Sequence, residues 1–154
     1  MGASTGLGYR WYRDGAPILN ATSKTYTLVP EDALATVSVS VTNSSNGAYP
    51  ASIVSAGVQV KGTITGVTPV MSAVGGTVKV GKKLTVSAAS LSGWSPSGLT
   101  FSYVWKVAGV TKSNTSSYTP VAADAGKAVT VTVTGTKTMF EPLVKTSASV
   151  TIAP

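Results

Sequence analysis

The side chains that could do chemistry are few, and they lack the partners that most enzyme mechanisms need. The chain of 154 residues contains no histidine and no cysteine, so a Ser-His-Asp triad, a thiolate nucleophile and a zinc–thiolate site are all excluded. A glycosidase needs two opposed carboxylates, and a calcium site needs several converging oxygen ligands. The acidic residues offer no convincing pair and no Asp-x-Asp pattern; they are Asp14, Glu31, Asp32, Asp124 and Glu141. We therefore expect no catalytic residue, no metal site and no cofactor.

Positive charge is the other chemical feature, and it is unevenly spread. The formal net charge is +7, and eight of the twelve basic residues follow Gly62. The densest cluster consists of Lys79, Lys82 and Lys83 around a turn at Gly81. These lysines could meet an anionic partner, although solvated lysines that keep a β-rich surface soluble are the simpler interpretation. No exposed aromatics alternate with the basic residues, so we expect no nucleic-acid partner.

Aromatic residues beside prolines mark three candidate binding loops. Trp94 stands in the segment SGWSPSG, where it could stack on a sugar or a partner, or equally close the end of a sandwich as a plug. Tyr49 and Pro50 end a second loop, and Met139 and Phe140 occupy a third. Loops at the ends of a sandwich commonly carry binding, but an aromatic there can also tuck under the sheet.

The elements that would position these residues are β-strands. Segments such as KAVTVTVTGT and KTSASVTIA alternate apolar and small polar residues, and Gly, Asn, Asp and Pro separate them. A membrane-spanning helix needs about 20 consecutive apolar residues, and no stretch of this sequence comes near that length, so we expect no membrane insertion. The sequence predicts an all-β sandwich architecture.

An internal repeat organises the chain. The segment from Tyr9 to Val60 matches the segment from Tyr103 to Ile152, and the tyrosine-to-aspartate spacing is six residues in both copies. The matched positions pair Trp11 with Trp105, Gly15 with Gly109, Tyr26 with Tyr118, Asp32 with Asp124, and Val37, Val39 and Val41 with Val129, Val131 and Val133. Shared positions favour shared structural duties, and each aspartate should accept N–H bonds in a turn.

The two copies differ at their starts. A leader before the second copy predicts two further strands, at residues 77–80 and 83–88, whereas the first copy has only MGASTGLG in that place. We therefore predict two modules, a truncated one at residues 1–63 and a complete one at 64–154. The first copy also has Leu34 where the second has Gly126, so its turn is expected to be less tight.

The chain resembles the tandem bacterial immunoglobulin-like repeats of actinobacterial surface and secreted proteins and of their bacteriophages. The resemblance is carried by VGKKLTV, GWSPSGLTFSYVWKVAGV, SSYTPVAADAGKAVTVTVTGTK and YRWYRDGAPILNATSKTYTLVPEDALATVSVSVT. It implies two immunoglobulin-like β-sandwich modules in tandem, the first lacking its leading strands, with Trp11 and Trp105 filling the centres of the sandwiches. Such modules serve as spacers, adhesins, carbohydrate binders and virion appendages, so the resemblance is specific for fold and not for function.

The preferred hypothesis for function is a non-enzymatic virion accessory protein, a capsid decoration or tail-attached module on the virion surface. Three observations led to it: an initial methionine, the lack of a secretion signal, and the absence of a histidine tag. The expected partner is a capsid protein or neighbouring subunit that completes the first module by strand addition. The alternative is an extracellular or cell-wall spacer, adhesion or carbohydrate-binding fragment that meets polysaccharide. Self-association into a homo-oligomer stays open under both hypotheses.

Overall fold

A computed structural model of the chain describes residues 6–44 and 51–154, and these residues confirm the all-β prediction. Strands dominate the described residues, and the one α-helix among them, α1 (Ala88–Ser92), is short. Backbone contacts divide the chain into two compact units, Met1–Gly62 and Thr63–Pro154. The predicted boundary lies one residue further along the chain.

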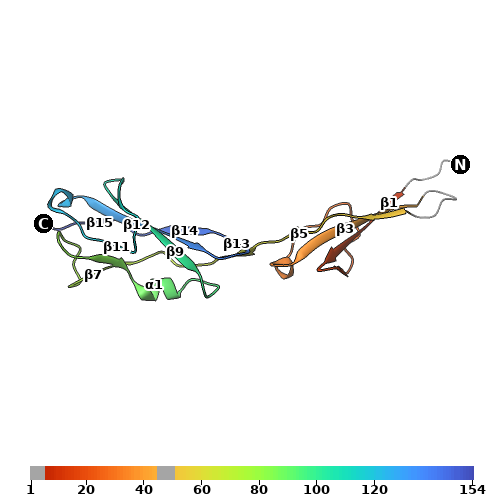
Figure 1. Ribbon diagram of the computed structural model, residues 1–154, viewed down its shortest axis with the longest axis horizontal. Helices are drawn as coiled ribbons and strands as arrows, with labels where there is room; N and C mark the ends of the chain where they lie inside the picture. Colours follow the sequence, from red (N-terminus) through yellow and green to blue (C-terminus); the bar gives the residue numbers. More distant parts are fainter. Residues whose placement is uncertain (1–5, 45–50) are drawn as a thin grey trace. The chain divides into compact units, whose positions relative to one another are not determined.

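The second unit contains two antiparallel sheets (Figure 1). The larger has the order β10-β9-β12-β14, with β15 also paired to β12, and the smaller has the order β11-β8-β7. The strands of the larger sheet are β9 (Thr100–Val107), β10 (Val110–Ser113), β12 (Ala128–Thr136), β14 (Leu143–Thr146) and β15 (Val150–Thr151). Those of the smaller are β7 (Met71–Ala73), β8 (Leu84–Val86) and β11 (Ser117–Tyr118), and a separate pair joins β6 (Gly62–Thr63) to β13 (Phe140–Glu141).

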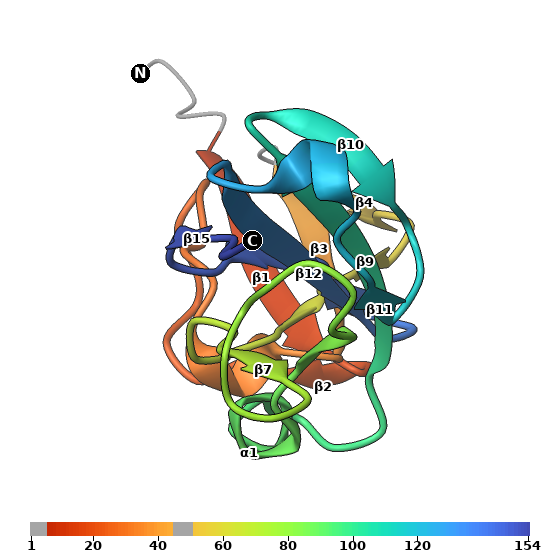
Figure 2. The same cartoon turned by 90° about the vertical axis from the view of Figure 1, so that its left-hand side faces the viewer.

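The two sheets enclose one apolar core, so this unit is a sandwich. In both views β7 and α1 lie to one side of β12 (Figures 1 and 2). Strand β12 turns one face towards this core: its buried residues alternate with less buried threonines, as the two-residue period of a strand requires. The larger sheet contributes Trp105 and three valines of β12 to the core, and the smaller contributes Leu84 and Val86.

The first unit has a single five-stranded sheet among its described residues. Its order is β2-β1-β3-β4, and β5 pairs with β3. The strands are β1 (Gly6–Arg13), β2 (Ala16–Pro17), β3 (Thr36–Ser44), β4 (Ala51–Val54) and β5 (Val58–Gln59). Trp11 stands opposite Val39 on the neighbouring strand, and Trp105 stands opposite Val131 in the same way. The single sheet of the first unit therefore has the same register as the larger sheet of the second.

Two expectations about local structure are wrong. Residues 77–80 form no strand: the partner of β8 is β7, with Met71 opposite Val86, and a turn with positive φ at Gly75 and Gly76 follows β7. Helix α1 begins at Ala88, where a strand end was expected.

The turn at Leu34 is not looser than its counterpart. Leu34 adopts φ +69° and Gly126 adopts φ +75°, both in the left-handed region. Each donates its backbone N–H across the unit, to Val60 and Ile152 respectively, at 2.9 and 2.8 Å. The first copy keeps the turn and places a leucine in a conformation that favours glycine.

Candidate functional site

The strongest candidate is the face of the first sheet that carries Trp11. Directly opposed residues, and residues two apart in a strand, share a face, so the register assigns one set of side chains to it. We call this set the Trp11 face: Leu7, Tyr9, Trp11 and Arg13 of β1, Val37, Val39 and Val41 of β3, Ile53 of β4, and Val58 of β5.

Three matched positions differ sharply in burial between the two units, whereas Val37, at 6% exposure, is nearly as buried as its counterpart Val129 at 0%. Trp105, Val131 and Val133 are 0% exposed. Trp11, Val39 and Val41, which match them, are only half-buried. At the edge of the face Ile53 and Val58 are 75% and 68% exposed. An equivalent apolar surface is thus a sealed core in one unit and an open face in the other.

The cause is the absence of a covering sheet. In the second unit β8 supplies Leu84 and Val86, at 0% and 9% exposure, to the core that contains Trp105. The described residues of the first unit contain no counterpart of β7 or β8. A groove of about 390 Å³ lies on the face instead, lined by Trp11, Tyr26, Leu28, Val37, Ser38, Val39, Ser55, Ala56, Val58 and Val60.

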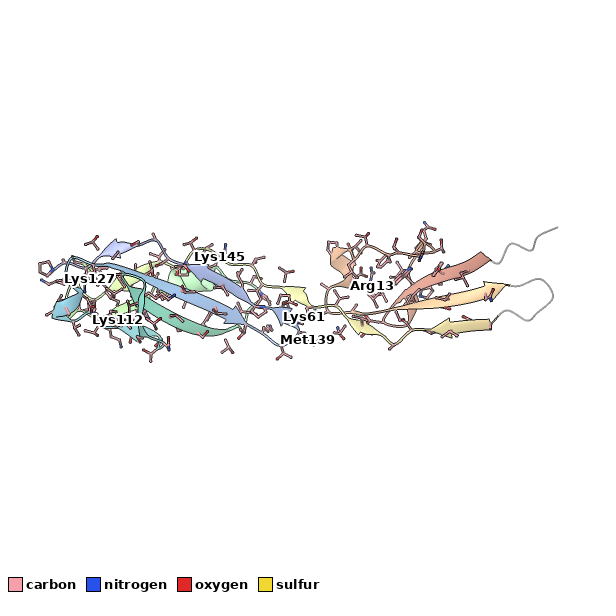
Figure 3. All side chains as sticks on the ribbon, turned by 90° about the horizontal axis from the view of Figure 1, so that it is seen from above. Arg13, Lys61, Lys112, Lys127, Met139 and Lys145 are labelled. Atoms are coloured by element: carbon pink, nitrogen blue, oxygen red, sulfur yellow. The ribbon has the colours of Figure 1, made fainter. Side chains whose placement is uncertain are left out.

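Buried Asp32 anchors one edge of this groove. Its carboxylate accepts hydrogen bonds from the backbone N–H of Val29 at 2.8 Å and from Tyr26 Oη at 3.0 Å. Arg13, which is labelled in Figure 3, donates its Nε–H to the other oxygen of Asp32 at 2.7 Å. Burial acts to raise the pKa of Asp32, but the Val29 N–H, Arg13 and Tyr26 together outweigh burial and leave the pKa lowered.

Asp124 repeats this arrangement in the second unit. It accepts hydrogen bonds from the backbone N–H of Val121 at 3.0 Å and from Tyr118 Oη, and Lys112 Nζ lies 3.0 Å from its other oxygen. The Tyr118 hydrogen bond, followed by that of Val121, lowers the pKa of Asp124 to about 2. Burial, followed by the Asp124 hydrogen bond, raises the pKa of Tyr118 to about 12. The predicted turn-capping duty of both aspartates is confirmed.

The sequence analysis did not identify the cations that pair with these aspartates. Arg13 is at the position of core Val107, whereas Lys112 comes from β10, so the pairs use different strands. A buried aspartate conserved between copies implies a partner for its charge, but the spacing from each aspartate to its cation differs. That difference left no repeated signal to detect.

Trp94 lies in the core of the second unit rather than on its surface. Its side chain is 5% exposed and meets Phe101 edge-on at 5.4 Å between ring centroids. A Cβ placed on Gly66 or Gly135 would come within 3.0 Å of the indole. Trp94 therefore closes the end of the sandwich, and its ring is not exposed for stacking on a sugar.

The other candidate residues are not brought together. Tyr49 and Pro50 lie outside the described residues. Met139 is 40% exposed, at φ +69°, while Phe140 is half-buried against the core with Lys137 Nζ 5.7 Å from its ring centroid. Lys82 and Lys83 are exposed at the Gly81 turn. These residues form no joint site comparable to the Trp11 face.

Within residues 6–44 and 51–154, no group of three or more acidic, histidine or cysteine side chains could hold a metal ion. Over the same residues, no helix is long and apolar enough to cross a membrane. A scan against protein-family models found no match, and a search of curated proteins found no match either.

Proposed function

We propose that this chain is a non-enzymatic structural and binding protein that attaches to a protein partner through the Trp11 face and displays its second unit. The setting we favour is a virion, where the chain would act as a capsid decoration or tail-attached module. The observation that carries the proposal is the contrast between the open Trp11 face and the same face sealed in the second unit.

The energetics favour covering this face. Burying apolar surface stabilises by about 25 cal/mol per Å², and contiguous exposed apolar patches on soluble proteins mark interaction sites. Trp11, Val39, Ile53 and Val58 contribute to one such patch. A protein surface suits it better than a polysaccharide, because its lining is largely aliphatic and Trp11 already donates its Nε1–H to the Ser23 carbonyl at 2.9 Å.

The second unit suits display because its own core is complete. Ten buried apolar residues form one cluster between its sheets, so it needs no partner to fold. The resemblance to immunoglobulin-like modules of actinobacteria and their phages supports a surface or virion setting. A virion also supplies what the open face requires, a neighbouring subunit held at high local concentration.

Mass spectrometry of virions purified from the phage that encodes the chain tests the setting. We expect the chain as a stoichiometric component, and its absence from the particles would refute the virion assignment. Attachment is then tested with two variants of adjacent residues in β4. Ile53→Asp places a charge on the Trp11 face, and Val54→Asp places one on the opposite face.

These variants form a matched pair because both parent side chains are highly exposed, at 75% and 60%. Both proteins should fold with little loss of stability. We expect Ile53→Asp to remove the chain from particles and Val54→Asp to leave its copy number unchanged. Equal incorporation of the two variants would show that attachment does not use the Trp11 face.

A further inference from the structure

We propose that the partner covers the Trp11 face with an extended strand that pairs antiparallel with Thr25 and Tyr26 and inserts two apolar side chains, two positions apart. The strand belongs to another protein chain and follows the pattern of Leu84-Thr85-Val86. This inference rests on the proposed function, since it names how the protein partner engages the same face.

The second unit supplies the template for this strand. There β8 pairs antiparallel with β11, with Leu84 opposite Tyr118 and Thr85 opposite Ser117. Leu84 and Val86 point into the core, and Thr85 between them is half-buried on the other side. The repeat places Thr25 and Tyr26 at the positions of Ser117 and Tyr118. A strand on the first unit should therefore lie opposite residues 25 and 26 in the same register.

The backbone that would receive the strand is unpaired. Within the described part of the chain, no hydrogen bond uses the backbone N–H or C=O groups of residues 25–28. This segment forms no strand, whereas its counterpart in the second unit begins with β11 (Ser117–Tyr118). Unpaired backbone groups of this kind are a template for pairing with another chain.

The receiving segment is nevertheless held in place. Tyr26 Oη and the Val29 N–H both donate to buried Asp32, which fixes the segment at two points three residues apart. The side chains of Tyr26 and Leu28 line the groove, while Thr25 and Thr27 are exposed. This alternation is that of a strand, so pairing would require little rearrangement.

The template differs at one corner. At the position of Val107, which is 1% exposed in the second unit, the first unit has Arg13. The guanidinium of Arg13 is paired with Asp32. The partner strand meets a charged side chain there, so its apolar contact is confined to the part of the groove lined by Trp11, Val39 and Val58. Two inserted apolar side chains, rather than a longer apolar run, match that extent.

The test supplies the template strand to the full-length chain. A copy of residues 69–88, which contain β7 and β8, is appended to the N-terminus through a flexible Gly-Ser linker of about 15 residues. The linker gives the segment an effective concentration in the millimolar range, so weak pairing is detectable. The control carries Leu84→Asp and Val86→Asp in the appended copy alone.

Two nuclear magnetic resonance readouts separate strand pairing from simple apolar contact. We expect amide hydrogen exchange to slow at least tenfold at whichever of Thr25 and Tyr26 points its N–H at the added strand, because hydrogen-bonded and non-hydrogen-bonded pairs alternate in an antiparallel ladder. The methyl resonances of Val39 and Val58 should also shift. The control should show neither change. The exchange of Ser117 and Tyr118 should stay unchanged, which shows that the appended copy has not displaced β8.

Each other outcome overturns the inference in a distinct way. Methyl shifts without slowed amides would mean that the face accepts apolar groups without strand pairing, which leaves the proposed attachment standing. No change in either readout would reject the strand template. If the unmodified chain sediments as a dimer with residues 25–28 already protected, and Ile53→Asp abolishes both, the occupant is a second copy of this chain.

Discussion

Replacing each repeat tryptophan with alanine measures how much the missing sheet contributes. Trp11 and Trp105 occupy the same position in matched strands, opposite Val39 and Val131. Each donates its Nε1–H to a backbone carbonyl, that of Ser23 at 2.9 Å or Thr115 at 3.0 Å. Each variant loses one hydrogen bond of this kind, so the difference between the two variants reports mainly the burial of the indole.

The expected costs follow from that burial. A fully buried aromatic side chain removes about 150–250 Å² from water, worth roughly 4–6 kcal/mol at about 25 cal/mol per Å². Trp105 is 0% exposed, so Trp105→Ala should destabilise the second unit by about 3–5 kcal/mol. Trp11 is half-buried, and Trp11→Ala should destabilise the first unit by about 2 kcal/mol.

Amide hydrogen exchange in increasing urea gives each unit its own free energy of unfolding within the full chain. Amides of β1 and β3 report the first unit, and amides of β9 and β12 report the second. If Trp105→Ala prevents folding of its unit, Val39→Ala and Val131→Ala replace the tryptophan pair. Val131→Ala should cost about 2 kcal/mol and Val39→Ala about half that, because Val131 is sealed and Val39 is not.

Equal costs in the two units would refute this reasoning. They would mean that the Trp11 face is covered when the chain is free in solution. Sedimentation of the same sample would then show whether the cover is a second copy.

Three further outcomes are expected. The pKa of Asp124 is lowered from 3.8 to about 2, so its stabilisation of the second unit is complete above about pH 4 and is lost as the pH falls to about 2; Asp124→Asn should flatten that part of a stability–pH curve. Leu34→Gly should stabilise the first unit by up to about 1 kcal/mol in urea denaturation, because it relieves a left-handed leucine, and Gly126→Leu should destabilise the second. Gly66→Ala should lower the melting temperature of the second unit, at a cost of about 1–3 kcal/mol, since its Cβ would lie 2.5 Å from the Trp94 ring; an unchanged melting temperature would contradict the packing of Trp94.

Much of the fold could be predicted because the same pattern of residues occurs in two copies. Trp, Tyr, Asp and the Val-x-Val-x-Val strand recur in order, and period-two alternation gives each strand its buried face. The role of Asp32 followed from its recurrence at Asp124, since only a structural duty is needed twice.

Other features depended on contacts between distant residues. Trp94 looked like a loop aromatic because its neighbours are Gly and Ser, but Gly66 and Gly135, far away in sequence, leave room for its ring. The position of β7 depended on which segment could pair with β8, and alternation in residues 77–80 could not decide that.

The sequence by itself determined that the chain is a β-protein with two copies of one sheet and that it carries no histidine or cysteine chemistry. Those properties are local, because composition and alternation express them residue by residue. The tertiary structure alone decided that Trp11 lies beside an open groove and that residues 25–28 have no backbone partner among the described residues. Burial and strand pairing depend on what lies opposite a residue in space. The described residues of the first unit form no second sheet opposite the Trp11 face.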